Sequence, residues 1–174
     1  MYETDAEIAA LQALLEASHA SGSPHLKSII TDERRLSAAH LAALLTGMKL
    51  LSVATVTSSG EPRISALDGH FLHATWTFST SGSSPKARQM AARPSVSVAH
   101  VDGEALAVFS HGTVAAMRAG DSDWQQTLDH WTTHYGSSPL SWGDDVVLYR
   151  YRPHWMVCYA SSPAELLAAR GITT

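Results

Sequence analysis

Apolar residues recur at helical spacing at the start of the chain. In residues 4–20, Ile8, Leu11 and Leu15 are separated by three and four positions, which predicts one amphipathic helix. Residues 26–35 have no clear period, and the run ITDERR at residues 30–35 is predicted to form a solvated loop. The chain is therefore expected to begin with one helix and a polar connection.

A second helix is predicted to begin after Ser37, which can cap it, and to end near Gly47. Neither helix carries a group of chemically reactive side chains. We therefore expect residues 1–36 to be a helical extension that packs on residues 37–174, with the whole chain forming a single globular domain.

From residue 50 the pattern changes to short apolar and β-branched stretches separated by turn residues. A break or bulge is predicted near His111-Gly112, and Pro153-His154 is predicted to separate the last two strands. Closely spaced antiparallel strands with tight turns predict a barrel, or a strongly curled sheet, of six or seven strands. The predicted strands include residues 50–57, 62–67, 76–79, 95–101, 105–117, 146–152 and 155–160.

Two more helices are predicted late in the chain. One covers residues 121–135 with Asp121 as its cap, and a last helix begins with a capping box at Ser162 and ends at Gly171. Residues spaced by four, three and four on the first of these helices form a stripe that is typical of core packing. The stripe is Trp124, Leu128, Trp131 and Tyr135.

The stretch from Trp76 to Val101 predicts a strand, a polar loop, a short helix and a second strand. Ser84 can cap the helix, and Pro85 at the first helical position gives up an N–H that would otherwise be unpaired. Unpaired amides, the helix dipole and nearby cations all favour a bound phosphate. The alternative is a surface turn followed by a solvated basic helix. The side chains brought to this helix start are Ser79, Thr80, Ser83, Ser84, Lys86 and Arg88.

Composition narrows the function classes. The chain has 174 residues, with 45% hydrophobic and 16% charged residues, which is typical of a globular protein. A net charge of -4 without a basic run argues against nucleic acid as a partner. No apolar run is long enough to span a membrane, and no signal-peptide pattern precedes the first helix. The single Cys158 favours a reducing compartment, so we expect a cytoplasmic protein.

The other familiar catalytic patterns are missing from the sequence. Ten histidines are present, but none lies in a metal-ligand motif, and His130 and His134 alone are too few for a structural metal site. There is no G-x-S-x-G, G-x-G-x-x-G or P-loop motif. No metal is therefore expected, and a bound cofactor is the better candidate to carry the chemistry.

Three motifs resemble the pyridoxamine 5′-phosphate oxidase-like split β-barrel flavoproteins, and more closely the flavin/deazaflavin-dependent oxidoreductases of that fold. They are LLSVATVTSSGEPRIS, FSTSGSSPKARQM with the following ARPSVSV, and PHWMVCY, and the resemblance covers roughly residues 37–161. It implies a mainly β fold with flanking helices, an antiparallel Greek-key split barrel that binds FMN. It also implies a homodimer with the cofactor at the subunit interface.

The resemblance also implies roles for individual residues. Arg63, Ser84 and Lys86 match positions that contact the cofactor phosphate, and Tyr159 matches an aromatic residue over the cofactor edge. One face of the flavin is expected against the barrel wall near Ser65, Leu67 and Ser79, and aromatic residues late in the chain, Trp142, His154 or Trp155, are expected to reach the neighbouring subunit's site. The full set of expected cofactor-binding residues is Arg63, Ser65, Ser79, Thr80, Ser84, Lys86, Arg88, Trp142 and Tyr159.

Several positions depart from the vitamin-B6 oxidases of this family. Pro85 and Asp68 stand where those enzymes usually carry basic residues, and Ala107 stands where glutamine is common. The C-terminal arginine-and-histidine motif that holds the B6 substrate is missing, because the chain ends LLAARGITT. Pyridoxamine phosphate oxidation is therefore not expected.

Two cofactors fit this pattern. FMN needs a compact phosphate site, whereas the deazaflavin coenzyme F-420 has an acidic tail that Lys86, Arg88 and Arg93 would line. The implied reaction is hydride transfer between the cofactor and a small-molecule substrate, with His70, His73 and Tyr159 as candidates for proton delivery. The alternatives are a heme-binding or heme-degrading protein that uses His111 or His154, and a cofactor-binding protein without turnover.

Overall fold

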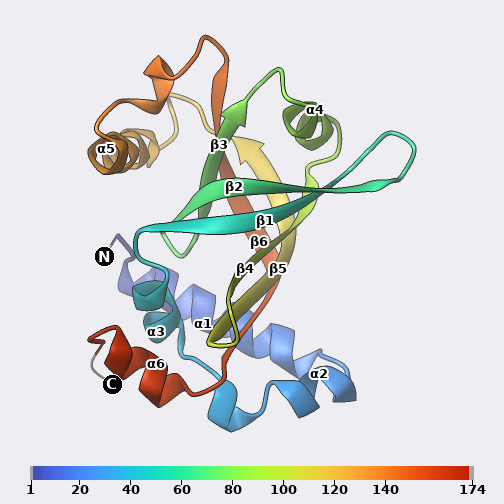
Figure 1. Ribbon diagram of the computed structural model, residues 1–174, viewed down its shortest axis with the longest axis vertical. Helices are drawn as coiled ribbons and strands as arrows, with labels where there is room; N and C mark the ends of the chain where they lie inside the picture. Colours follow the sequence, from blue (N-terminus) through green and yellow to red (C-terminus); the bar gives the residue numbers. More distant parts are fainter. Residues whose placement is uncertain (1, 173–174) are drawn as a thin grey trace.

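The computed structural model describes residues 2–172 and contains a closed antiparallel β-barrel (Figure 1). Within these residues the barrel has six strands in the order β1-β2-β3-β6-β5-β4, and β4 closes it by pairing with β1. This arrangement confirms the predicted mainly β fold. The strands are β1 Met48–Val56, β2 Pro62–Leu72, β3 Thr75–Ser81, β4 Ser95–Asp102, β5 Leu106–Ala116 and β6 Val146–Ala160.

Helices lie at both ends of the barrel (Figure 1). α1, α2, α3 and α6 lie together at one end, and α4 and α5 lie at the other, on either side of the strands. The hairpin of β1 and β2 projects beyond the barrel on the side of α4. The helices are α1 Asp5–Ala20, α2 Pro24–Ile29, α3 Ala38–Leu44, α4 Pro85–Ala92, α5 Trp124–Tyr135 and α6 Pro163–Ala169, with short 3-10 helices η1 Asp32–Arg34 and η2 Pro139–Ser141.

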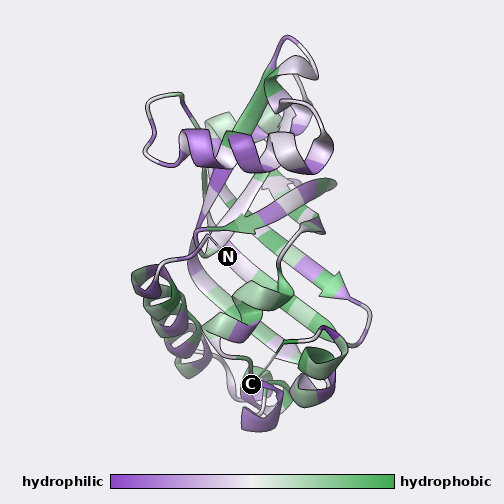
Figure 2. Ribbon diagram, turned by 90° about the vertical axis from the view of Figure 1, so that its left-hand side faces the viewer, coloured by the Kyte–Doolittle hydropathy of each residue, from purple (hydrophilic) through white to green (hydrophobic). Residues whose placement is uncertain are grey.

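The core lies inside the barrel and continues under the helices (Figure 2). Because successive side chains of a strand point to opposite faces, every second residue of each strand enters the barrel. Leu51, Phe78 and Tyr151 are fully buried there. A second, smaller core forms outside the barrel where α5 covers β2, β3 and β6. Its buried members are Leu72, Met117, Trp131 and Leu148.

Two strands are longer than the sequence predicted. β2 continues without interruption to Leu72, and β6 is one strand of 15 residues rather than two strands separated at Pro153-His154. The predicted irregularity at His111/Gly112 is confirmed as a register shift between β5 and β6. Proline has no N–H for a β-ladder. The register shift opposite Pro153 lets β6 pass through this position without ending.

Four predictions about helices were wrong in detail. α5 begins at Trp124 with Asp123 at the cap position, whereas the Asp121 carboxylate accepts a hydrogen bond from the Arg118 N–H. Residues 24–29, for which no helix was predicted, form α2, and the supposed loop 30–35 contains η1. The second helix ends at Leu44 rather than near Gly47, and Met48 already begins β1. Ser162 makes no side-chain hydrogen bond to the start of α6, although Pro163 does begin that helix.

The N-terminal helix α1 is attached to the barrel by both apolar and polar contacts. Leu11 and Leu15 are buried, and the Ser18 hydroxyl accepts a hydrogen bond from the Met156 backbone N–H at 2.9 Å. The Gln12 side chain likewise accepts from the Ala38 N–H at 2.8 Å. In the described part of the chain, no helix has both the length and the apolar character needed to cross a membrane.

Candidate functional site

The start of α4 has the local structure that the sequence predicted. The Ser84 hydroxyl caps the helix by accepting a hydrogen bond from the Ala87 N–H at 3.2 Å, and Pro85 occupies the first turn. Thr80, near the end of β3, places its hydroxyl 3.3 Å from that of Ser84. Lys86 follows in the first turn and is half-buried. Two hydroxyls and a cation therefore meet at one helix N-terminus.

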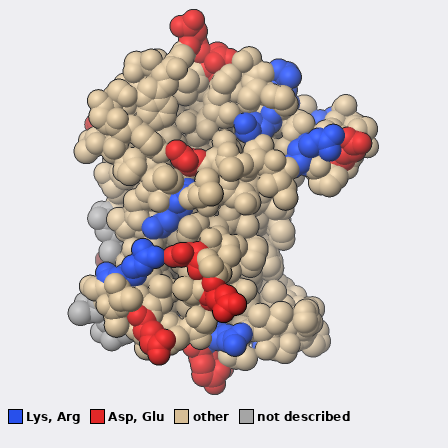
Figure 3. Space-filling model, in the orientation of Figure 1, with Lys and Arg blue, Asp and Glu red and all other residues tan. Residues whose placement is uncertain are grey.

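The cations of α4 have no acidic partner within the described residues. No carboxylate there forms an ion pair with Lys86, Arg88 or Arg93. Lys and Arg side chains gather on the surface around α4 and the projecting hairpin (Figure 3). The Arg88 guanidinium donates a hydrogen bond to the Ser83 carbonyl. Three cations on and next to α4 thus lack an ion-pair partner among the described residues.

One part of the predicted anion site is already filled by the chain itself. The Asp145 carboxylate accepts a hydrogen bond from the Ser83 N–H at 2.9 Å and another from the Ser81 hydroxyl at 2.9 Å. Hydrogen bonds from Ser83 and Ser81 hold the pKa of Asp145 below its usual value. Among the unpaired amides expected in this loop, that of Ser83 is therefore already bonded, and the remaining donors lie on the side of Thr80, Ser84 and Lys86.

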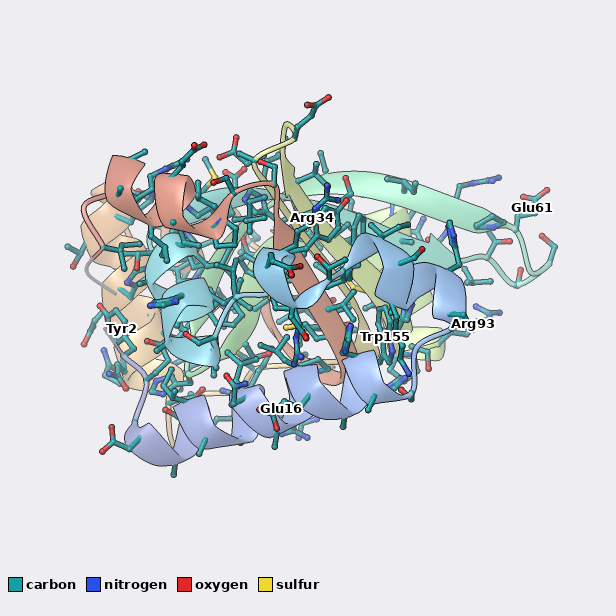
Figure 4. All side chains as sticks on the ribbon, turned by 90° about the horizontal axis from the view of Figure 1, so that it is seen from below. Tyr2, Glu16, Arg34, Glu61, Arg93 and Trp155 are labelled. Carbon is teal, nitrogen blue, oxygen red and sulfur yellow. The ribbon has the colours of Figure 1, made fainter. Side chains whose placement is uncertain are left out.

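Arg63 lies on the β1–β2 hairpin, on the face that looks toward α4. Its register partner is Thr55, whose hydroxyl donates to the Gln89 side chain of α4 at 2.5 Å. Directly paired residues of an antiparallel ladder share one face of the sheet, so Arg63 faces the same side as Thr55. Arg63 also forms an exposed ion pair with Glu61, with 2.7 Å between Nη2 and Oε2, at the end of the projecting hairpin (Figure 4).

The pleat of the sheet divides the other candidate residues between two faces. Ser65 and Thr80 have the same parity as Leu67 and Phe78, so they share the face of Arg63. Ser79 has the opposite parity and points to the outer face. The structure therefore brings Arg63, Ser65, Thr80, Ser84 and Lys86 to one side of the sheet and does not bring Ser79 to them.

Trp142 lies beyond η2, against the ring of Tyr135 with 4.9 Å between ring centroids. Its indole N–H donates to the Ser137 hydroxyl, and the residue is 41% exposed. Three residues later the chain reaches Asp145, which binds the loop before α4. Trp142 is therefore connected to the α4 end of the barrel by a short segment.

Tyr159 and His73 lie away from the start of α4. Val146 of β6 pairs with Ser81, but Tyr159 pairs with Ala107 near the other end of the same long strand. His73 lies in the β2–β3 turn at the opposite end of β3 from Ser81, between the Glu7 carboxylate at 3.1 Å and the Gln126 side chain at 3.0 Å. Within one chain, neither residue joins the Lys86 group.

His70 belongs to a cluster that sequence reasoning did not find. Its ring lies between β2 and α5, 2.9 Å from His130 (Nδ1 to Nε2) and 3.3 Å from the Tyr135 hydroxyl. Burial, followed by the nearby His130 and His134, lowers the pKa of His70 to about 3. The only available signal was the four-residue spacing of His130 and His134, which does not reveal a partner 60 residues away.

The outer face of the barrel exposes several large apolar side chains. Ile64 is 75% exposed and Leu50 is 61% exposed, and Phe109 lies beside them at a shallow pocket shared by β1, β2, β4 and β5. At the edge of this face the His111 ring stacks on Trp155 with 4.8 Å between centroids, and His111 Nδ1 lies 2.8 Å from the Ser97 hydroxyl. Trp155 lies near the C-terminal half of α1 (Figure 4).

Comparison with solved structures shows the same fold in proteins of low sequence identity. An FAD-binding protein from Mesorhizobium loti is 22% identical with a TM-score of 0.57, and the match covers 73% of this chain and 96% of that one. A protein described as an F-420 reductase is 19% identical with a TM-score of 0.52, covering 66% and 93%. HutZ, a heme storage protein from Vibrio cholerae, is 19% identical with a TM-score of 0.58, covering 72% and 95%.

A search of curated proteins finds no match. The model of the pyridoxamine 5′-phosphate oxidase family, however, matches residues 37–153, which include all of the strands except the end of β6. This match spans more than half of the chain and contains the start of α4 and the β1–β2 hairpin. The protein therefore belongs to the pyridoxamine 5′-phosphate oxidase family.

Proposed function

We propose that the protein is an FMN-dependent oxidoreductase that transfers a hydride between FMN and a small-molecule substrate. The observation that carries this proposal is the arrangement at α4, where Thr80, Ser84 and the unpaired Lys86 meet at a helix start beside the hairpin face of Arg63. Hydroxyls, a helix N-terminus and cations together favour a phosphate group. Family membership and the similarity to an FAD-binding protein support a flavin as the molecule that carries this phosphate group.

In this proposal the chain's own residues bind and orient the cofactor. Lys86 supplies charge to the phosphate, Ser84 and Thr80 supply hydroxyl donors, and Arg63 adds a second cation when its exposed ion pair with Glu61 opens. FMN, when bound, supplies the hydride chemistry. Arg88 is assigned to the phosphate end of the cofactor, and Ser65 to the side of the flavin ring. Trp142 and Tyr159 are assigned to the edge of the site, with Tyr159 coming from the second subunit.

The same proposal includes a homodimer with the cofactor at its interface. Large apolar side chains such as Ile64 and Leu50 are rarely left exposed together on one sheet face unless another surface covers them. The hairpin that carries Arg63 extends from that face and leaves the α4 side only partly enclosed (Figure 1). A second copy would cover the face and complete the site.

Coenzyme F-420 is the alternative cofactor, and one feature favours it. Arg88 and Arg93 line a surface pocket between α4 and the β1–β2 turn together with Thr57, Ser58 and Gln89. Within the described residues no carboxylate pairs with either arginine. This pocket suits the acidic tail that F-420 has and FMN lacks, and the similarity to an F-420 reductase agrees with it.

Absorbance of the protein with each cofactor tests the proposal. Purified apoprotein is titrated separately with FMN, F-420 and hemin, and the expected spectra are flavin bands near about 370 and 450 nm, a deazaflavin band near about 420 nm, or a Soret band. Saturable FMN binding followed by bleaching of the bound flavin with a hydride donor supports the proposal. Binding of hemin alone, with His111 or His154 as the ligand candidates, overturns it, and so does FMN that binds but never exchanges a hydride.

A further inference from the structure

Five polar side chains form an unbroken line between β2 and α5. Tyr135 Oη lies 3.4 Å from Asp68 Oδ2 and 3.3 Å from His70 Nε2. His70 Nδ1 lies 2.9 Å from His130 Nε2, and His130 Nδ1 lies 3.0 Å from Tyr2 Oη. Each of the inner three groups therefore contacts a neighbour on both sides. The line connects β2, α5 and the N-terminal segment, and Tyr2 lies beside α5 (Figure 4).

The carboxylate at one end sets the direction of every hydrogen bond in this line. The ionised Asp68 only accepts, so the Tyr135 hydroxyl donates to it, and the Tyr135 oxygen then accepts from His70 Nε2–H. A neutral imidazole with a proton on Nε2 has a bare Nδ1, which accepts from His130 Nε2–H. The same reasoning makes Tyr2 the donor to His130 Nδ1. With one proton added to the pair, His130 can instead donate its Nδ1–H to the Tyr2 oxygen, so all four bonds stay satisfied until both imidazoles are charged.

The middle of the line is buried in the small core under α5. His70 has no exposed surface, and its ring lies 4.7 Å from that of the buried Trp131. Leu72 and Leu148 belong to the same apolar layer as Trp131. Burial lowers the pKa of His130 as well as that of His70, with His134 contributing to both. The surroundings of His70 therefore favour uncharged imidazoles.

We propose that the line from Asp68 to Tyr2 is an acid-sensitive latch that holds α5 and the N-terminal segment on the barrel and releases them when the His70–His130 pair takes up protons. When both rings are protonated, His70 Nδ1–H faces His130 Nε2–H, two donors 2.9 Å apart. The added charge would also lie in an apolar layer, where an unpaired charge is strongly unfavourable. Moving α5 outward relieves both problems.

No described group is placed to offset this charge. His70 is faced by His130, His134, Tyr135 and Trp131 from α5, and from β3 the Thr77 hydroxyl donates to the His70 carbonyl rather than to the ring. His130 is faced by Tyr2, His70 and His134. Within residues 2–172, the Asp68 carboxylate reaches the line only through Tyr135. A proton on either imidazole therefore meets no acidic partner.

Release of α5 would also change the candidate cofactor site. Tyr135 supports Trp142 by an edge-to-face contact, and the segment after Trp142 leads to Asp145, which fills part of the loop before α4. The latch thus links the protonation of two histidines to the segment beside the start of α4. It does so whether or not the protein uses a flavin.

The direction of the pH effect follows from proton counting. An opened α5 returns His70 and His130 toward the ordinary histidine pKa of about 6.5, so below that pH the open state binds more protons than the docked state. The opening equilibrium constant should then rise by about tenfold per pH unit for each histidine that is freed. For His70 this dependence continues down to its docked-state pKa of about 3.

Hydrogen exchange of the cofactor-free protein tests the latch. Exchange is followed by NMR between pH 7 and pH 4.5, and each amide's opening constant is corrected for the intrinsic pH dependence of exchange. We expect the amides of α5 to show at least about a tenfold rise in opening constant per pH unit below about pH 6.5, while those of β5 stay constant. Glutamine can accept and donate like a neutral imidazole but never charges, so His70→Gln and the double variant with His130→Gln should reduce and then abolish the rise. The matched control is His25→Gln, at an exposed position of α2.

Each outcome decides the proposal. Exchange of α5 that is independent of pH in the parent overturns it, and so does acid opening in which α5 and β5 exchange together, because that is global unfolding. A rise that persists in the double variant also overturns it. If the variants do not fold, nitrogen NMR of the parent still decides, since the latch requires both rings to be neutral Nε2–H tautomers at pH 7 and His70 to charge only together with loss of α5 protection.

Discussion

Lys86 is the residue on which the cofactor proposal depends most directly. It lies in the first turn of α4, after the Ser84 cap, and no carboxylate of the described residues pairs with it. An unpaired cation at a helix N-terminus and the helix dipole both attract the same anion. The loop before α4 already binds one anion, because the Asp145 carboxylate accepts a hydrogen bond from the Ser83 N–H.

Replacing Lys86 with alanine should weaken FMN binding about ten- to a hundredfold, since a charge-assisted hydrogen bond contributes roughly 1.5 to 3 kcal/mol. Lys86→Arg should restore part of the affinity, because the charge returns with a different geometry. Fluorescence titration with FMN and with F-420 measures both. Lys27→Ala is the matched control, because Lys27 is an exposed lysine on α2 at the other end of the barrel, and Arg35→Ala is a second one. Equal affinities of Lys86→Ala and the parent would contradict the phosphate site.

Gly112 gives a prediction about stability that is independent of the cofactor. A Cβ there would lie 2.3 Å from the Arg152 carbonyl oxygen and 2.8 Å from the Pro153 Cα, both backbone atoms of β6. Gly112→Ala must therefore push the strands apart at the bulge, and we expect a loss of about 1–3 kcal/mol. Gly120→Ala, where a Cβ meets nothing within 4 Å, is the control. Urea unfolding measures both, and equal midpoints would show that the bulge tolerates a side chain.

At the scale of elements, features that depend on neighbouring residues could be predicted from the sequence, and features that depend on distant residues could not. The start of α4 could be predicted because Ser84 and Pro85 act on their own helix turn. β6 was divided wrongly because Pro153 usually ends a strand, and nothing local indicates that its missing N–H coincides with a bulge opposite Gly112. Helix α2 was missed because six residues are too few to show a period.

The candidate site, too, could be predicted only where its residues are neighbours in the chain. The cations and hydroxyl at the start of α4 followed from the sequence, since Lys86, Arg88 and Ser84 are neighbours in the chain. Asp145 and the His70–His130 contact could not be predicted, because they join residues 62 and 60 positions apart through the packing of the segment between β5 and β6. Ser79 was expected on the same barrel wall as Ser65 but lies on the opposite face. Which residues of β2 and β3 share a face depends on the pairing register of the two strands, and the sequence does not give that register.

The element α1 should contribute stability rather than cofactor chemistry. It buries Leu11 and Leu15 and supplies the acceptor for the Met156 N–H, at the end of the barrel opposite α4. Deleting residues 1–34 should cost several kcal/mol, because two buried leucines alone contribute roughly 1.5–3 kcal/mol each, while leaving the FMN affinity of the folded fraction unchanged. If the truncated chain does not fold, Ser18→Ala should cost about 1–3 kcal/mol, since it leaves the Met156 N–H buried without a partner. Calorimetric melting and FMN titration separate the two effects, and loss of FMN binding by a folded variant would contradict this assignment.

At the scale of the whole molecule, the exposed apolar face of the barrel is the feature that one chain leaves unexplained. Ile64 and Leu50 lie on adjacent strands with most of their surface exposed, and Phe109 extends the face onto β5. A stable interface typically covers about 800 Å² on each partner and has an apolar centre. This face, continued by the projecting hairpin, provides such a centre for a second copy of the chain.

We therefore expect the parent to sediment at twice 18.7 kDa at micromolar concentration. Ile64→Lys should shift it to the monomer mass, because an unpaired ammonium buried in an apolar interface costs several kcal/mol and weakens association about a hundredfold or more. Ile29→Lys is the matched control, since Ile29 is also an exposed isoleucine but lies on α2, away from this face. The monomeric variant should keep the parent's circular dichroism and bind FMN more weakly than the parent, because its site lacks the second subunit. A parent that sediments as a monomer, or an Ile64→Lys dimer with unchanged FMN affinity, would contradict both the interface and the shared cofactor site.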